Sequence, residues 1–197
     1  TANILEYENH LTEQIVNAPN LIGIEQEDID RDNKGQFYRI AKHVEVDFNL
    51  QNSGSWSVLP NGDKVWRLKM TSTGAQGTLL FFNDFYLPVG SRMHVYSPDK
   101  KQMLGAFTSY NNHESKMFAT ALIKGESCII EYYEPVEQSG NGQLSINEFG
   151  YVYRAANAVD DLDEDDSQMS PEESDFCEVD VKCPECAAWA DQIRGAC

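Results

Sequence analysis

The sequence lacks a long hydrophobic run, an excess of basic residues and, over most of its length, cysteine. No stretch approaches the roughly 18 apolar residues of a transmembrane helix. The net charge is −17, whereas nucleic acids and anionic membrane surfaces are bound by clustered Lys and Arg. The sequence therefore predicts a protein with neither a nucleic-acid partner nor a membrane partner.

Motifs that carry catalysis are also missing. No serine lies in a GxSxG frame, and no glycine-rich loop is suited to cradling a phosphate. The histidines are His10, His43, His94 and His113, and each is isolated in sequence, whereas a catalytic histidine needs a positioned partner. We therefore expect no catalytic residue, no cofactor and no enzymatic activity from these 197 residues.

The sequence does contain alternating apolar residues in short stretches. From Lys42 onward, Val44, Val46 and Phe48 alternate with acidic or polar residues, which is the period of a half-buried β-strand. Two further alternating stretches flank Asn61-Gly62, and Asn-Gly between β-prone runs is a strong hairpin signal because both residues tolerate positive φ. This hairpin is expected to place Trp56 opposite Trp66.

Six more short β-prone stretches follow, separated by turn-forming clusters at intervals of about 8 to 12 residues. They cover residues 77–82, 92–97, 102–108, 117–122, 127–134 and 143–153. This spacing indicates an all-β fold, an antiparallel β-sandwich or jelly roll, over residues 36–154. Residues 1–35 form a separate N-terminal segment, with a short helix expected over 1–15 and a solvated loop over 25–36.

Aromatic residues recur in the β-rich part, including Trp56, Trp66, Phe81, Phe82, Tyr132 and Tyr133. In a β-sandwich such residues usually fill the core, because aromatic side chains dominate the buried area. The same residues could instead line a groove that binds carbohydrate. A β-sandwich module for adhesion or carbohydrate binding is therefore one alternative function.

The composition changes sharply after the last β-prone stretch. Residues 155–181 contain 11 Asp and Glu and no Lys or Arg, and few large apolar residues. The acidic run lacks the Gly and the distal Glu of an EF-hand calcium loop. Residues 155–176 are therefore expected to be a disordered, extended acidic linker.

Four of the five cysteines lie in residues 177–197: Cys177, Cys183, Cys186 and Cys197. The preferred interpretation is that these four form disulfides. Cys183 and Cys186 form a CxxC pair, so a zinc site or a dithiol redox site at these two residues remains as a second alternative function. The spacing of the four cysteines does not match the usual paired zinc knuckles.

Residues 54–108 and 118–135 resemble the N-terminal pro-region of secreted bacterial lysyl-endopeptidase-like serine protease precursors. Residues 177–197, "CEVDVKCPECAAWADQIRGAC", resemble the first residues of their trypsin-like catalytic domain, which typically opens with Cys, five residues and Cys-Pro-Glu. The sequence differs from that family at Cys186, where the family usually has Gly. The order of the parts is also that of such a precursor: pro-region, linker, start of the protease.

The resemblance implies a non-catalytic propeptide that binds its cognate trypsin-like protease domain as folding chaperone and inhibitor, in a secreted protein. It also implies that Cys177 and Cys183 pair with cysteines further along the protease domain, and the catalytic His, Asp and Ser of the family fall outside these residues. No Lys occurs from Gly125 to Val181, so a lysyl-specific enzyme has nothing to cut in the linker. Arg154 and Lys182 are the candidate cleavage sites.

Overall fold

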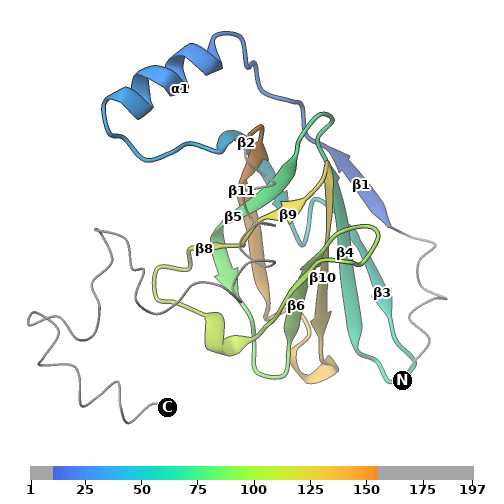
Figure 1. Ribbon diagram of the computed structural model, residues 1–197. Helices are drawn as coiled ribbons and strands as arrows, with labels where there is room; N and C mark the ends of the chain where they lie inside the picture. Colours follow the sequence, from blue (N-terminus) through green and yellow to red (C-terminus); the bar gives the residue numbers. More distant parts are fainter. Residues whose placement is uncertain (1–10, 155–197) are drawn as a thin grey trace, which may run out of the picture. The chain divides into compact units, whose positions relative to one another are not determined.

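The structure, a computed structural model, describes residues 11–154 and is a β-sandwich of two sheets, as the sequence predicted. Figure 1 shows the two sheets face to face, with one α-helix set apart from them. The strands are β1 (Thr12–Ile15), β2 (Ala41–Asn49), β3 (Ser55–Val58), β4 (Lys64–Thr71), β5 (Gly77–Tyr86), β6 (Arg92–Tyr96), β7 (Met103–Phe107), β8 (Phe118–Ala119), β9 (Ile123–Lys124), β10 (Ser127–Glu134) and β11 (Gln143–Val152). The helices are α1 (Ile24–Asn33) and the short 3-10 helices Ser109–Asn111 and Val136–Gln138.

The first sheet, sheet A, has the strand order β1-β4-β10-β6-β7, and β3 also pairs with β4. The outer edge of β4 is shared: β3 pairs with residues 64–67, and β1 pairs with residues 68–71. All pairs in this sheet are antiparallel except β1 with β4, which is parallel. The N-terminal segment therefore contributes a strand to the sandwich.

The second sheet, sheet B, has the order β2-β11-β5-β8, and β9 also pairs with β5. β11 is the last strand of the described residues but lies inside the sheet, hydrogen-bonded to β2 on one side and to β5 on the other. Both pairings reach Val152, two residues before the end of the described chain. Sheet B therefore depends on β11, whose pairings end with two residues remaining before the acidic segment begins.

The core lies between the two sheets and is strongly aromatic. Alternate residues of β4 and β10 point inward, since Trp66, Leu68, Ile130 and Tyr132 have no exposed surface. The fully buried or nearly fully buried side chains of sheet B that oppose them include Leu80, Phe82, Phe85, Ile146 and Phe149. Burial of one face of each strand explains the alternation in the sequence.

The predicted hairpin is confirmed. β3 and β4 pair antiparallel, with Trp56 directly opposite Trp66, and Gly62 takes a φ of 90° in the connecting turn. The aromatic residues noted in the sequence differ in burial. Trp66, Phe82 and Tyr132 are buried in the core, whereas Trp56 is 39% exposed. Three of the six named aromatics therefore fill the core, whereas Phe81 and Tyr133 are half-buried.

The expectation of a loop over residues 25–36 was wrong, because residues 24–33 form α1. The helix follows Gly23, which has a φ of 79°, and has Glu25 and Glu27 in its first turn and Arg31 in its last, which suits the helix dipole. Only Ile24 and Asp28 of the helix are buried, so the apolar periodicity that would have revealed it is absent.

Several sequence predictions lie outside the described residues. These are residues 1–10 of the helix expected over 1–15, His10, the acidic linker, Lys182 and the four cysteines Cys177, Cys183, Cys186 and Cys197. The expected helix was wrong for its described part, because Thr12–Ile15 form the strand β1, whose backbone pairs with β4. Cys128 is described, and it is a free cysteine buried in the core. None of the helices in residues 11–154 has both the length and the hydropathy of a membrane-spanning segment.

Candidate functional site

The outer face of sheet A carries a groove with a volume of about 420 Å³. It is lined by Leu11, Arg67, Lys69, Tyr96, Pro98, Lys100, Met103, Ile129 and Glu131, and we call it the sheet A groove. The strand register explains its floor: Lys69 lies opposite Ile129, Ile129 opposite Tyr96 and Tyr96 opposite Met103. One cross-strand row therefore spans four strands, with apolar side chains in the middle and a cation at one end.

Charged groups surround this apolar row. Glu131 accepts a hydrogen bond from Arg67 Nε at 2.7 Å and one from the Tyr96 hydroxyl at 3.4 Å. Lys69 pairs with Glu13 of β1 at 2.9 Å. Lys100 lies in the turn between β6 and β7 and has a φ of 60°. The groove thus offers an apolar floor with three cations and one carboxylate from its lining residues, a mixture typical of protein interfaces.

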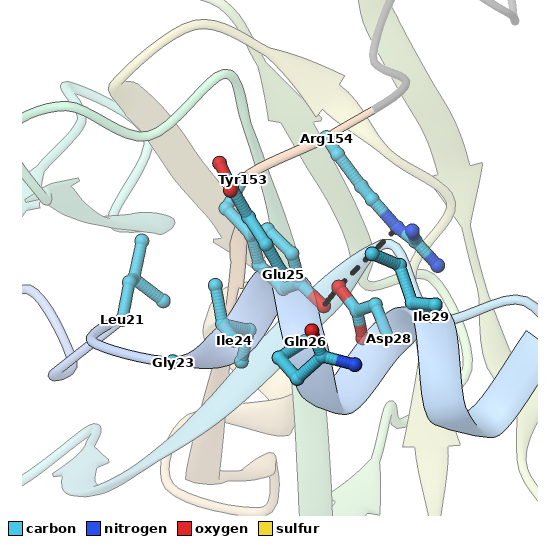
Figure 2. A pocket seen from close by; sticks show the side chains of 9 residues that line it. All are labelled: Leu21, Gly23, Ile24, Glu25, Gln26, Asp28, Ile29, Tyr153 and Arg154. Carbon is cyan, nitrogen blue, oxygen red and sulfur yellow. Dashed lines mark hydrogen bonds and ion pairs between the residues drawn. The ribbon is translucent and has the colours of Figure 1, made fainter.

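A second hollow, a cleft of about 750 Å³, lies between α1 and the end of β11. Figure 2 shows Asp28 of α1 beside Tyr153 and Arg154. Asp28 is only 2% exposed, accepts a hydrogen bond from the Tyr153 hydroxyl at 2.8 Å and pairs with Arg39 Nη2 at 2.8 Å. We call Asp28, Arg39, Tyr153 and Arg154 the Asp28 cluster; it joins the helix to the last strand of sheet B.

Arg154 is held in this cluster by four groups. Its Nε donates a hydrogen bond to the Arg39 carbonyl at 2.6 Å and lies 3.6 Å from an Asp28 carboxylate oxygen. Its Nη2 lies 3.6 Å from Asp32 and is shielded from solvent. The guanidinium carbon stacks 3.9 Å from the centre of the Tyr38 ring. The candidate cleavage residue Arg154 is therefore engaged in the folded chain.

Because Asp28 is ionisable, the stability of the contacts between α1 and the end of β11 should depend on pH. Burial alone would raise its pKa, but hydrogen bonds from Tyr153 and Arg39, with the charges of Arg39 and Arg154, hold the pKa below its ordinary value. The stabilisation is then fully present above an ordinary Asp pKa of about 4 and is lost as the pH falls through the lower folded value.

We predict that Asp28→Asn lowers the free energy of unfolding by about 2 kcal/mol at pH 6, because it removes a charged acceptor from the cluster. The difference between wild type and variant should shrink as the pH falls below about 4. Urea denaturation of both proteins from pH 6 to pH 2 measures this difference in unfolding free energy. The contributions of the other carboxylates cancel in the difference, because both proteins carry them. A difference that stays constant over this range would contradict the prediction.

The candidate histidines lie apart in the structure. His43 on β2 stacks on Phe81 with ring centres 4.7 Å apart and contacts the Glu148 carboxylate. His94 on β6 lies opposite Glu131. His113 accepts a hydrogen bond from the Ser115 backbone N–H at 3.2 Å, which is a local turn. The described part of the chain does not bring these three histidines together.

Metal binding finds no support within residues 11–154, where no three His, Cys, Asp or Glu side chains form a group that could hold an ion. The cysteine pair considered for zinc lies outside these residues. The sequence interpretation missed both the sheet A groove and the Asp28 cluster. In the structure, Arg67, Glu131 and Tyr96 lie on the outward faces of β4, β10 and β6, and only the order of these strands brings the three side chains together.

The chain matches no known protein-family model. Among solved structures it was aligned with the periplasmic inhibitor of g-type lysozyme from Aeromonas hydrophila, PliG, at 10% identity and a TM-score of 0.26, covering 72% of this chain and 97% of that one. A family 6 carbohydrate-binding module gave 14% identity and a TM-score of 0.25, covering 58% of this chain and 94% of that one. A family 35 carbohydrate-binding module from an environmental isolate gave 13% identity and a TM-score of 0.23, covering 56% of this chain and 83% of that one.

These TM-scores are too low to support an argument from any of the three structures. The function of this chain is therefore argued from its own residues.

Proposed function

We propose that this chain is the pro-region of a secreted serine endopeptidase followed by the first residues of its protease domain, and that the sandwich is a non-catalytic module that binds that domain. The observation that carries the proposal is the place where the sandwich ends. β11 completes sheet B at Val152, so the module is closed before the acidic segment and the protease-like residues 177–197 begin.

A sandwich that precedes the protease domain in the chain can act as a template for the folding of that domain. Within residues 11–154, both sheets and the core are formed by residues up to Tyr153, so we propose that the sandwich can fold as soon as β11 is made. A trypsin-like barrel depends on long-range strand pairing, which is slow, and a prefolded partner can stabilise its incomplete states. The segment 155–176 can span up to about 75 Å when extended, and it keeps the two parts at high effective concentration.

The sheet A groove is the contact surface that we assign to the protease domain. The exposed end of its apolar row, Met103 at 56% exposure, supplies area to bury, and its cations supply charge complementarity. Residues 155–197 carry 13 Asp and Glu against Lys182 and Arg194, and Glu178 and Asp180 lie in the first residues of the protease-like part. An acidic partner surface would therefore be attracted to this side of the sandwich.

We predict that the gene continues in frame beyond Cys197 into a trypsin-like domain with its catalytic His, Asp and Ser. Refolding that domain with the present chain added should raise the recovered activity at least about tenfold, because the sandwich stabilises the folding barrel. Adding the chain to the active enzyme should inhibit hydrolysis of a lysyl peptide substrate. A stop codon or an unrelated domain after Cys197, or an enzyme that refolds and works equally well without the chain, would contradict the proposal.

Two matched charge variants locate the contact. Lys100→Asn removes a groove cation while Asn tolerates the φ of 60°, and it should weaken inhibition about fivefold at low salt and less at high salt. Lys34→Asn removes an exposed cation at the end of α1 and should leave inhibition unchanged. If Lys100→Asn and Lys34→Asn changed inhibition equally, the protease domain would not bind at the sheet A groove.

Carbohydrate binding is a second candidate function, and the same groove favours it. Its lining combines hydrogen-bonding groups of Glu131 and Lys69 with Tyr96, whose side chain is 8% exposed at the floor of the groove. Titration calorimetry with neutral and acidic oligosaccharides separates the two candidates. Binding that is lost in Tyr96→Ala, together with no effect on the protease, would favour this second function.

A further inference from the structure

We infer that the peptide bond after Arg154 is a shielded proteolytic site, which α1 protects through the Asp28 cluster and which opens to a protease of basic specificity only when α1 is displaced. The inference goes beyond the proposed function, because it concerns any such protease and not only a cognate one. It rests on contacts that the folded chain makes with the side chain of Arg154 and with the backbone before the bond to be cut.

The first requirement for cleavage is an accessible basic side chain. Trypsin-like enzymes insert a Lys or Arg side chain into a pocket that pairs its charge with a carboxylate. In this chain the Arg154 guanidinium is already paired with Asp28 and Asp32, each at 3.6 Å, and donates to the Arg39 carbonyl at 2.6 Å. The protease must remove all these contacts before it can bind the side chain.

Tyr38 covers the guanidinium from another side. Its ring centre lies 3.9 Å from the guanidinium carbon of Arg154, which is the geometry of a cation–π contact. The ring is itself 59% exposed, so it packs on Arg154 without being part of the sandwich core. Removing this ring should uncover Arg154 with little effect on the fold.

The backbone before the bond is held as well. A protease binds its substrate as an extended strand and hydrogen-bonds to the residues before the cleaved bond. Here the Tyr153 N–H donates to the Ile40 carbonyl at 3.1 Å, and the Tyr153 carbonyl accepts from Gln76 Nε2 at 2.8 Å. Before Tyr153, β11 is paired with β2 and with β5 as far as Val152. Both the side chain and the backbone are therefore engaged.

Arg154 lies at the junction between the sandwich and the acidic segment, so shielding it controls whether the two can be separated. Arg154 is the last basic residue before a stretch without Lys or Arg that extends to Val181. While α1 is docked, a protease of basic specificity cannot separate the sandwich from the acidic segment at this junction. Displacement of α1, by a partner or by loss of the Asp28 charge, would expose the cut that releases the sandwich.

The test is a time course of trypsin digestion of the full chain at neutral pH, with the fragments identified by mass spectrometry. A synthetic peptide of residues 150–160 gives the rate for an unshielded Arg154. We expect the full chain to be cut after Arg154 at least about 100-fold more slowly than the peptide, because cleavage follows the small population in which α1 has opened. Cutting at the peptide's rate would overturn the inference.

Three variants distinguish shielding from general instability. Asp28→Asn should speed the cut after Arg154 about tenfold and Tyr38→Ala several-fold, because each weakens the contacts that close the site. Asp30→Asn changes an exposed carboxylate of the same helix whose hydrogen bond is to Gln26, so it should stay within about twofold of wild type.

Cleavage after Arg67 in β4 reports unfolding of the sandwich itself. It should not change in Tyr38→Ala or Asp30→Asn, whereas in Asp28→Asn it should rise with the loss of global stability predicted above. Acceleration at Arg67 in Tyr38→Ala as large as that at Arg154, or no acceleration at Arg154 in Asp28→Asn and Tyr38→Ala, would overturn the inference.

Discussion

Trp66→Ala is expected to lower the free energy of unfolding by about 4 kcal/mol, which is the scale measured for large aromatic residues removed from packed cores. The Trp66 side chain has no exposed surface, and its indole N–H donates to the Ser53 carbonyl at 2.9 Å. The substitution therefore leaves a cavity between the sheets and an unpaired buried carbonyl. Urea denaturation followed by far-UV circular dichroism measures the change without relying on tryptophan fluorescence.

Trp56→Ala is the matched control, because Trp56 lies directly opposite Trp66 on the neighbouring strand but is 39% exposed. Its indole N–H also donates to a backbone carbonyl, that of Leu50 at 3.1 Å. It should cost about 1 to 2 kcal/mol, since less apolar surface leaves the core. Equal losses from the two tryptophans would show that Trp66 is not the centre of the core.

Gly142→Ala is the second change with a large expected effect, about 3 kcal/mol, because there is no room for a methyl group. A Cβ at this position would lie 2.0 Å from the Tyr132 hydroxyl oxygen and 2.7 Å from the ring carbon that bears it. That hydroxyl donates to Glu134 at 3.1 Å, and the Gly140 N–H donates to the same carboxylate at 3.0 Å. Glu134 is only 2% exposed, so displacing Tyr132 also disturbs the hydrogen bonds of a buried carboxyl group.

Gly140→Ala separates the steric effect from backbone strain. Gly140 has a φ of 83°, and a Cβ there would meet no atom within 4 Å. Its substitution should cost only the strain of a non-glycine residue in the left-handed region, about 1 kcal/mol. Thermal and urea denaturation of the two variants compare them directly. A cost for Gly142→Ala no greater than that for Gly140→Ala would contradict the steric explanation.

The strands were largely predictable because one face of each is buried. The alternation of Val44, Val46 and Phe48 predicted β2, and the Asn61-Gly62 turn predicted both β3 and β4 with Trp56 opposite Trp66. The short strand β9 was missed, since two residues are too few to show a period. α1 was missed for a different reason: its buried face consists of Ile24 and the charged Asp28.

The surfaces were not predictable, because they depend on which strands become neighbours. Lys69, Ile129, Tyr96 and Met103 come from four different strands, and only the order β4-β10-β6-β7 puts them in one row. The parallel pairing of β1 with β4 likewise leaves no local pattern in a strand of four residues. A groove on the outer face of a sheet is thus a property of strand order and register.

The sequence by itself determined an all-β sandwich over most of the described residues, because alternating burial requires a period of two along every strand. It also determined where basic residues are absent after Arg154. Only the tertiary structure decided that Arg154 is engaged, since its partners Arg39 and Asp28 lie more than 100 residues earlier in the chain. Such contacts are specified by the packing of α1 against the end of β11, which no local sequence pattern encodes.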